Sequence, residues 1–483
     1  MHVTRLWLLL IVLVGLLAAE TVAQRDALAP RYVSSSCPVS ASDSFEAEGV
    51  TYECGLLTVF QRRNPPGIST LTLWVVRIYP PQPTGQAPVV YLAGGPGQSA
   101  LDQLDMWLRS ALRQQHEIIL IDPRGAGFSN PSLDCPEFDG TAFGTPAADC
   151  RQRLSTQNVD LTIFNTTESA ADVADLLVAL EIPQANLVGF SYGTRLALAV
   201  LRDNPERVRS VVLDAVVPPQ INIYSQPAQE AQRALDTLFR TCRSDSACAS
   251  AYPDLENAFY MLVTMLDRQP VQIQLPGTSV VLVYTGADLL RDVLNWMYDA
   301  RQIPQIPQRL QWLIDGETSR YGAMLDSVAI TQPMIGVSEG LYLNVTCREE
   351  VAFVNTDRVL TELRAAPGSL GQLVRRQTEA LFAACIEWNM PAAEANVRSS
   401  VMSGVPVLLL NGQFDPVVAP GWAALAAETL SNHRQVLLPD TGHGSINATP
   451  CADAIVLAFL ANPLGQAPPC VDQLQPPQFV LPG

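Results

Sequence analysis

Positive charge is scarce in this sequence, and it comes from one residue type. The 483 residues include 30 basic and 47 acidic side chains, which gives a net charge of -17. There is no lysine, so all 30 basic residues are arginine. A strongly acidic chain repels phosphate backbones and anionic lipid headgroups. The charge balance therefore argues against a nucleic-acid partner and against an anionic membrane surface.

Long apolar runs are missing too, except at the N-terminus. Arg5 precedes an uncharged apolar run over residues 6–19, and small residues follow at Thr21 and Ala23. This is a signal-peptide pattern, and the run is shorter than the ~20 apolar residues that cross a membrane. We predict a signal peptide over residues 1–23 and a secreted protein, extracellular or periplasmic, without a membrane partner after cleavage. An uncleaved anchor is the alternative.

Metal-binding patterns are also lacking. The sequence has no CxxC pair and no cluster of cysteine and histidine, so we expect neither a metal nor another cofactor. Its ten cysteines fall as neighbours along the chain, and export implies an oxidising compartment that favours disulfides. Sequence alone leaves the connectivity open. Our hypothesis pairs neighbours: Cys37 with Cys54, Cys135 with Cys150, Cys242 with Cys248, Cys347 with Cys385 and Cys451 with Cys470.

Apolar strand-like runs alternate with helical stretches in the first half of the chain. Examples are "APVVYLAGGPG", "EIILIDPRGAGFS", "NLVGFSYGTRLALAVL" and "RVRSVVLDAVVPP". Runs that are apolar throughout are typical of a parallel sheet covered on both faces. The alternation then gives way to a mostly helical stretch and resumes near the C-terminus. We predict a core of residues 50–217 and 404–472, a mainly helical cap over residues 218–403 inserted after the sixth strand, and an irregular tail over residues 473–483.

A serine stands where one of these strands turns into a helix. In "LVGFSYGTRLALAV", Gly189 and Gly193 flank Ser191 at two residues on either side. Glycines relieve the contacts of such a sharp turn, which exposes the hydroxyl at the carboxyl edge of the sheet beside a helix N-terminus. The pattern is that of a nucleophile elbow, and it makes Ser191 a candidate nucleophile. The alternative is a tight glycine turn with an idle serine.

A serine nucleophile needs a histidine and an acid to activate it. Among four histidines, His443 in "DTGHGS" lies in a loop after a strand and follows the serine in the expected order. Asp415, in "LLLNGQFDPVV", is the favoured acid because it follows a buried strand and precedes His443. Asp214 at the end of "SVVLD" and Asp440 near the histidine remain as alternatives.

Two backbone N–H groups are needed for the oxyanion of the transition state. The residue after the nucleophile, Tyr192, supplies one of them. The "GGPG" turn supplies the other, and Pro96 has no N–H, so the donor is Gly94, Gly95 or Gly97. We choose Gly95.

In this order, "GGPG", "DPRGAGFS", "GFSYGT", "NGQFDPVVAP" and "GHG" resemble the α/β-hydrolase fold. More narrowly, they resemble the secreted tripeptidyl aminopeptidase and proline iminopeptidase family, over about residues 56–470. Proline iminopeptidases usually have a histidine before the GGPG turn, whereas Ala93 stands here, as in the tripeptidyl branch. The resemblance implies a mostly parallel central sheet with helices on both faces and a helical cap. It also implies a triad of Ser191, Asp415 and His443, and metal-free serine exopeptidase action on short peptides.

An aminopeptidase must hold a free ammonium group, which a buried carboxylate suits. In the cap, "LNVTCREEVAF" resembles the tripeptidyl family's cysteine followed two residues later by an acid. This implies a substrate-binding role for Glu349, with Glu350 as its neighbour, although the family more often has aspartate there. The alternative is a pair of glutamates that favour a helix N-terminus. The expected partners are peptides with a free N-terminus.

Two other functions stay open on sequence alone. A secreted carboxylesterase or lipase would use the same triad without an anionic anchor. A non-catalytic binding protein could keep the fold, although all three triad residue types are present. A halide or epoxide hydrolase is disfavoured, because that mechanism needs aspartate at the elbow where this chain has Ser191.

Overall fold

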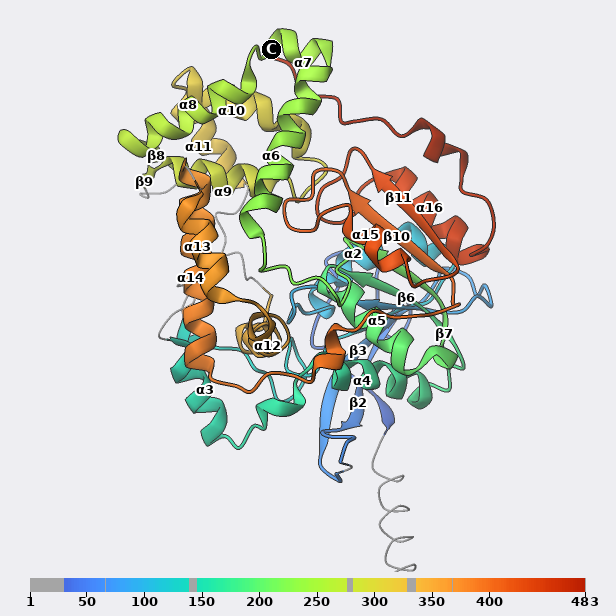
Figure 1. Ribbon diagram of the computed structural model, residues 1–483. Coiled ribbons are helices and arrows are strands. Elements are labelled where there is room, and N and C mark those ends of the chain that lie inside the picture. The colour runs from blue at the N-terminus through green and yellow to red at the C-terminus, as the bar shows by residue number, and fades with distance from the viewer. Residues whose placement is uncertain are drawn as a thin grey trace, which may run out of the picture.

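A computed structural model describes residues 30–482, except residues 66, 139–145, 276–280, 328–335 and 367. These residues form a sheet-based core and a helical cap (Figure 1). The predicted signal peptide over residues 1–23 lies outside the described residues. Within the described residues, no helix is both long and apolar enough to cross a membrane.

A nine-stranded sheet lies at the centre of the described structure, in the order β1-β2-β3-β5-β4-β6-β7-β10-β11. The strands from β5 to β11 pair in parallel, and β3, β2 and β1 extend β5 as an antiparallel edge. This confirms the predicted mostly parallel sheet. The strands are β1 (Arg31–Ser35), β2 (Tyr52–Phe60), β3 (Thr70–Ile78), β4 (Val89–Leu92), β5 (Ile118–Ile121), β6 (Ala185–Phe190), β7 (Val208–Asp214), β10 (Val407–Gly412) and β11 (His433–Leu438).

Helices cover both faces of this sheet, as predicted. Val90 and Leu92 belong to the apolar cluster under α4 and α5, whereas Val89 and Tyr91 belong to the cluster under α2 and α16. Strands that bury both faces need apolar residues at every position, which explains the continuous run of β4. The helices of the core are α2 (Leu104–Leu108), α3 (Pro146–Thr156), α4 (Thr166–Ala179), α5 (Tyr192–Asp203), α15 (Trp422–Ala427) and α16 (Pro450–Ala461).

The cap is inserted between β7 and β10. Its longest described helix, α14, packs against α6, α9, α12 and α13, and also against α3 of the core (Figure 1). The cap helices are α6 (Pro227–Ser244), α7 (Ser246–Ala251), α8 (Leu255–Arg268), α9 (Gly286–Trp296), α10 (Ile306–Ile314), α11 (Thr318–Ser327), α12 (Glu339–Val345), α13 (Thr356–Ala365) and α14 (Gly368–Trp388). A short hairpin of β8 (Val271–Gln274) and β9 (Val281–Tyr284) joins them.

Two details differ from the sequence analysis. The cap follows the seventh strand rather than the sixth, because β1 adds an edge strand whose mostly exposed sequence "RYVSS" has no apolar alternation. The hairpin β8–β9 also interrupts the helices of the cap, and its strands have only four residues each. Both features are short and lie at edges, where local sequence patterns are weak.

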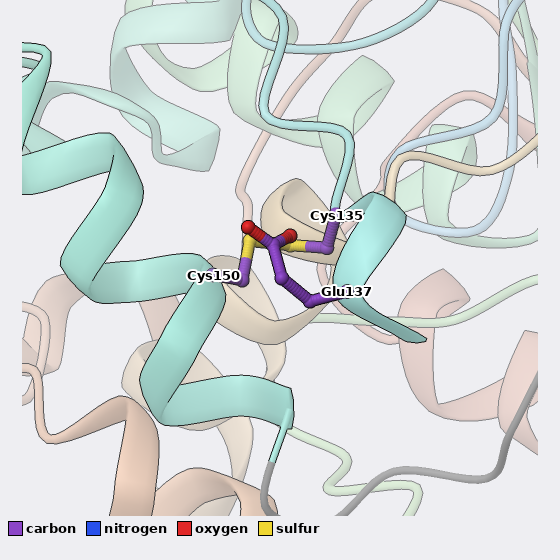
Figure 2. A group of neighbouring side chains, drawn as sticks. All are labelled: Cys135, Glu137 and Cys150. Atoms are coloured by element: carbon purple, nitrogen blue, oxygen red, sulfur yellow. A yellow bond between two sulfur atoms is a disulfide. The ribbon is translucent and has the colours of Figure 1, made fainter. Parts of the chain in front are cut away.

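The five predicted neighbour pairs of cysteines are the five disulfides of the structure, which leaves no cysteine free. Cys135 and Cys150 lie close to Glu137, and this is the described group of acidic, cysteine and histidine residues whose geometry could suit a metal (Figure 2). The two sulfur atoms are bonded to each other, however, and metals bind thiolates. Glu137 pairs with Arg153 at 2.5 Å. We therefore assign this group a structural role.

Candidate active site

Ser191 lies on a strained turn between β6 and α5. Its backbone has φ 54° and ψ -120°, a conformation that residues other than glycine rarely adopt. A Cβ atom on Gly189 would collide with the carbonyl of Gly193, and one on Gly193 would collide with the carbonyl of Leu92. Both glycines are therefore required by the close approach of β6, α5 and β4. The turn leaves the serine half-buried at the carboxyl edge of the sheet.

His443 and Asp415 form a hydrogen-bonded pair at the same edge. The His443 Nδ1 atom lies 2.8 Å from Asp415 Oδ2, and the other carboxylate oxygen accepts the N–H groups of Val417 and Val418 at 2.9 and 2.8 Å. Asp415 is fully buried, and because the carboxylate accepts at Nδ1, the Nε2 atom is left for proton transfer. Burial alone would lower the pKa of His443, but the charge and hydrogen bond of Asp415 outweigh that effect and raise it.

Aromatic rings hold the imidazole beside the elbow. The rings of Phe190 and His443 have centroids 5.1 Å apart, and Phe190 directly precedes Ser191. On another side, the ring of Tyr298 lies 4.9 Å from the imidazole, and the Tyr298 carbonyl accepts the His443 backbone N–H at 3.1 Å. A Cβ atom on Gly94 would lie 3.2 Å from both Phe190 and the Ser191 Cβ. The Ser191 turn, the loop that carries His443 and the GGPG turn therefore meet around Phe190.

The two alternative acids lie differently. Asp214 is buried, and its Oδ2 atom accepts the backbone N–H groups of Ser445 and Ile446 at 2.7 and 2.9 Å rather than the imidazole of His443. Burial raises the pKa of Asp440, whose Oδ1 atom has no hydrogen-bond partner in the described structure. The geometry thus pairs His443 with Asp415.

The two proposed oxyanion donors lie on either side of the elbow. Tyr192 is the first residue of α5, so its N–H has no partner within the helix. In the glycine turn, the carbonyl of Gly94 accepts from Gln98 and the carbonyl of Gly97 accepts from Ser338. Gly95 has φ 105°, and its N–H has no backbone partner among the described residues. Among the described residues, neither N–H group has a hydrogen-bond partner, so both can bind an anion.

The two candidate glutamates sit in the π-helical turn Thr346–Glu350 and are both buried. Glu350 is neutralised from two sides, because it forms ion pairs with Arg195 and with Arg398. Burial, followed by the charge of Arg398, lowers the pKa of Arg195 to about 10, so Arg195 stays cationic at neutral pH. The Glu350 carboxylate is therefore committed to this ion-pair network.

Glu349 has a different environment. Its carboxylate accepts from the backbone N–H of Thr166 at 2.8 Å and from the Thr166 hydroxyl at 2.5 Å, at the start of α4. The Thr166 hydroxyl also lies 2.7 Å from the hydroxyl of Tyr192. Because threonine uses its only proton on the carboxylate, Tyr192 is the donor of that second bond. Within the described residues, no arginine or histidine lies within ion-pair distance of Glu349.

Comparison with known proteins identifies the family of this chain. A family model described as alpha/beta hydrolase fold matches residues 87–446, which is more than half of the chain. The chain belongs to the alpha/beta hydrolase fold family. Serine protease Hip1 of Mycobacterium tuberculosis is 22% identical to this hydrolase over 458 residues, which cover 86% of each chain.

Of two further proteins that match this hydrolase, one covers less of the chain and the other is less similar in sequence. Tripeptidyl aminopeptidase of Streptomyces lividans is 29% identical over 196 residues, which cover 35% of this chain and 36% of that protein. Among solved structures, a thermophilic esterase from Thermogutta terrifontis is 14% identical, with a TM-score of 0.38, over 84% of this chain and 98% of that one.

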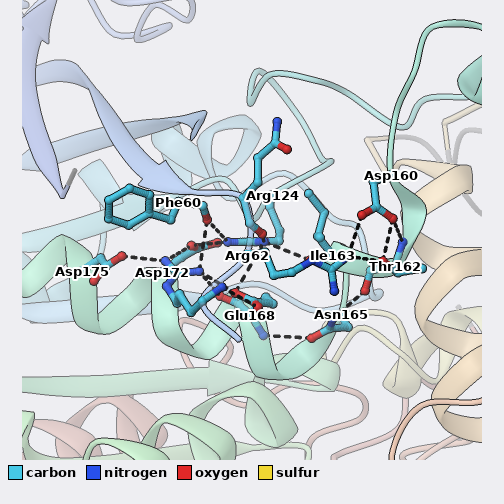
Figure 3. A network of polar contacts seen from close by, with 12 residues as sticks. Phe60, Arg62, Arg124, Asp160, Thr162, Ile163, Asn165, Glu168, Asp172 and Asp175 are labelled. Atoms are coloured by element: carbon cyan, nitrogen blue, oxygen red, sulfur yellow. Dashed lines mark hydrogen bonds and ion pairs between the residues drawn. The ribbon is translucent and has the colours of Figure 1, made fainter. Parts of the chain in front are cut away.

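The "DPRGAGFS" motif of this hydrolase has a structural explanation. Arg124 is fully buried and binds both carboxylate oxygens of Asp172 at 2.6 and 2.7 Å (Figure 3). Arg63 binds Asp172 as well, together with Glu168 and Asp175. These acids lie on α4, so the network fixes the helix whose first residue contacts Glu349.

The structure also identifies site residues that the sequence analysis missed. Thr166, Tyr298 and Arg398 come from segments far from the triad in sequence, and no motif marks them. Tyr298 follows α9 in the cap, and Arg398 lies in a short 3-10 turn before β10. The other two histidines of the described residues lie elsewhere: His116 binds the carbonyl of Ala87, and His433 begins β11.

Proposed function

We propose that this hydrolase is a secreted serine peptidase that removes N-terminal residues or short peptides from substrates with a free N-terminus. The proposal is supported by the His443–Asp415 pair beside the strained Ser191 turn. It is further supported by relatives named serine protease Hip1 and tripeptidyl aminopeptidase. The five disulfides are consistent with an oxidising compartment, and we propose export after cleavage of residues 1–23.

In the proposed mechanism, the Ser191 hydroxyl oxygen attacks the scissile carbonyl while His443 Nε2 takes the hydroxyl proton. Asp415 holds the imidazole in the required tautomer and stabilises the imidazolium. The N–H groups of Tyr192 and Gly95 stabilise the oxyanion. When the C–N bond breaks, His443 returns the proton to the leaving amine. Water then attacks the acyl-enzyme with His443 as its base, and the N-terminal fragment leaves as a carboxylic acid.

The observation that carries the aminopeptidase proposal is the state of Glu349. Glu349 is a buried carboxylate that forms no direct ion pair within the described structure, although the charges of Arg195, Arg348 and Arg398 act on it. A substrate ammonium group at hydrogen-bond distance would be its direct cationic partner. Glu350 does not fit this role, because Arg195 and Arg398 already neutralise it. We therefore propose Glu349 as the amine anchor and Glu350 as the residue that holds the cap turn in place.

The position of Glu349 also bears on the length of the released fragment. Two hydrogen bonds and one tyrosine side chain connect its carboxylate to the backbone next to Ser191. This path sets an upper limit on the separation, so a fragment between the two groups spans at most a few extended residues of ~3.3–3.6 Å each. We propose release of short N-terminal peptides, as the name of the tripeptidyl relative also suggests.

The test compares free and N-acetylated peptide nitroanilides of one to four residues, with p-nitrophenyl acetate as a neutral substrate. An unpaired buried carboxylate costs ~2–5 kcal/mol, so wild-type enzyme should prefer free peptides by tens-fold or more. Glu349→Gln should remove that preference and spare ester hydrolysis, because the ester does not use the anchor. Glu350→Gln is the matched control, and it should lower stability while keeping the preference.

Other outcomes point to other functions. If Glu350→Gln rather than Glu349→Gln lost the preference for free peptides, Glu350 would be the anchor. Equal cleavage of free and acetylated peptides would reject the aminopeptidase in favour of an endopeptidase, and hydrolysis of esters alone would favour a carboxylesterase. If the wild type hydrolysed none of these peptides and esters, a non-catalytic binding protein would be favoured.

A further inference from the structure

Asp214, the last residue of β7, contacts the segments of two members of the proposed triad. Its backbone carbonyl accepts the N–H of Ser191 at 2.9 Å. Its Oδ2 atom accepts the N–H groups of Ser445 and Ile446, which follow His443 by two and three residues. One buried residue thus ties the elbow to the histidine loop.

The backbone around Asp214 is held firmly. The next residue, Ala215, has φ 58°, which is uncommon for alanine. The Ala215 N–H donates to the carbonyl of Leu410 on β10 at 3.0 Å, and Ala215 is fully buried. Asp415 follows the end of β10, so the same turn connects β7 to the strand that leads to the catalytic acid.

The second oxygen of the Asp214 carboxylate is unusual. The Oδ1 atom is buried and has no hydrogen-bond partner in the described structure. A buried carboxylate with an unused oxygen is costly, and an uncharged acceptor could bind the two loop N–H groups equally well. The charge itself therefore calls for an explanation.

A negative charge on Asp214 raises the pKa of the His443 imidazole, whereas burial raises the pKa of Asp214 itself. The titratable groups that face His443 are Asp415 on the loop after β10, Asp214 on β7 and Tyr298 after α9. Of these, Asp415 has the larger effect on the pKa of His443, and the charge of Asp214 adds to it in the same direction. Phe190 contributes only an apolar surface.

We propose that Asp214 is a positioning residue of the triad, which holds the His443 loop against the Ser191 elbow and supplies a second negative charge to the imidazolium. This inference rests on the proposed triad. Asp214 has no contact with the reacting atoms in this assignment, and it acts through the loop and through its charge.

Two variants separate the loop contacts from the charge. Asp214→Asn keeps an oxygen for the two loop N–H groups and loses the charge, whereas Asp214→Ala loses both. Asp440→Asn is the matched control, because it removes a charge three residues from His443 without breaking a hydrogen bond to the imidazole. Rates on p-nitrophenyl acetate are measured as kcat and KM against pH, with circular dichroism and thermal melting as checks of folding.

We expect Asp214→Asn to shift the acid limb of kcat/KM to lower pH, because removal of a negative charge lowers the pKa of His443. Asp214→Ala should show the same shift and, in addition, a loss of plateau kcat of about tenfold or more. Asp440→Asn should match wild type in both measurements. A role confined to stability would lower the melting temperature and leave the acid limb unchanged.

A folded Asp214→Ala enzyme with wild-type kcat and acid limb would overturn the assignment. If Asp214→Ala does not fold, an unchanged acid limb in Asp214→Asn would overturn it instead. Labelling of Ser191 by a fluorophosphonate probe separates this failure from that of the proposed function. An inactive, unlabelled wild type would reject the triad and this inference with it, whereas an active wild type with an unaffected Asp214→Ala rejects this inference alone.

Discussion

Ser191 differs from the other described serines in its backbone as well as its position. It is the serine with positive φ among the described residues, and the glycines on either side permit the close approach of the segments around its turn. Alanine can occupy the same turn at similar cost, since both residues carry a Cβ atom. The hydroxyl can therefore be removed without changing the fold around it.

Ser191→Ala should yield a folded protein with almost no turnover. We expect a loss of kcat on the order of 10^3-fold or more, because the nucleophile is absent while binding and the oxyanion donors remain. Peptide and ester hydrolysis measure the loss, and circular dichroism checks the fold. Near-normal activity in this variant would contradict the triad.

Asp415→Asn should be far more damaging than Asp214→Asn. Asparagine in place of the catalytic acid favours the wrong histidine tautomer, which costs about 10^4-fold in kcat, whereas Asp214→Asn keeps both loop hydrogen bonds. Rates at the pH plateau compare the two variants. A larger loss in folded Asp214→Asn would mean that Asp214 is the catalytic acid.

The pH profile follows from the direction of the His443 shift. Neutral imidazole is the active base, and the Asp415 contact raises the pKa of His443 above its usual ~6.5. The base is therefore protonated and inactive below that raised pKa, so kcat/KM should fall with decreasing pH through a midpoint above ~6.5. A kcat/KM profile measured on the ester decides this, and a midpoint below the usual histidine value would contradict it.

Some residues of the candidate site could be predicted from a local sequence motif, and others could not. The Ser191 motif is local, since five consecutive residues determine the turn. The amine anchor is not local: Glu349 contacts Thr166, which is 183 residues away, and Glu350 is neutralised by Arg195 and Arg398. Sequence therefore identified the glutamate pair only through its resemblance to a family, and the difference between its two members needed the three-dimensional contacts.

At the level of elements, the apolar strands of the parallel sheet were predictable because burial on both faces leaves no polar position. The exposed edge strand β1 lacks such a constraint, which is why the count of strands before the cap was wrong by one. The four-residue strands of the hairpin lack it too, which is why the predicted helical cap omitted them. Helix α4 shows a further limit. Its start binds the candidate anchor, yet its position depends on the buried Arg124 and the partly buried Arg63, which come from two other segments.

Arg124→Leu should therefore be strongly destabilising. The change removes the Arg124 donor from the carbonyls of Gln61 and Ile163, removes one of the donors to the Phe60 carbonyl, and removes one of two cations from Asp172. Loss of a buried ionic partner costs about 3–5 kcal/mol of unfolding free energy, which urea denaturation measures. Arg243→Leu is the control: its ion pair with Glu256 is exposed, so the change should stay within about 1 kcal/mol. Equal effects of the two variants would contradict a central role of the network.

At the scale of the whole molecule, the C-terminal tail joins the core to the cap. Cys451–Cys470 fixes the start of the tail to α16, and the chain end lies beside α7 of the cap (Figure 1). There, Val480 donates its N–H to the carbonyl of Pro304 and accepts from the hydroxyl of Tyr252. The predicted irregular tail is thus free of strands but bound at both ends, through contacts that its proline-rich sequence does not encode locally.

Phe479→Ala should loosen this connection. Phe479 is only 7% exposed and belongs to the same apolar cluster as the cap helices, so its removal should cost about 1.5–3 kcal/mol of burial. We expect a lower melting temperature and faster proteolysis near Tyr252 and Pro304, which the tail contacts. Leu481→Ala is the matched control, because Leu481 is 44% exposed and its backbone carbonyl keeps the bond from Gln308. If Phe479→Ala and Leu481→Ala melt and are cleaved alike, the tail does not hold the cap. If only Phe479→Ala opens the cap, peptide turnover should fall as well, because the Tyr298 carbonyl of the cap accepts the His443 N–H and the Tyr298 ring contacts the imidazole.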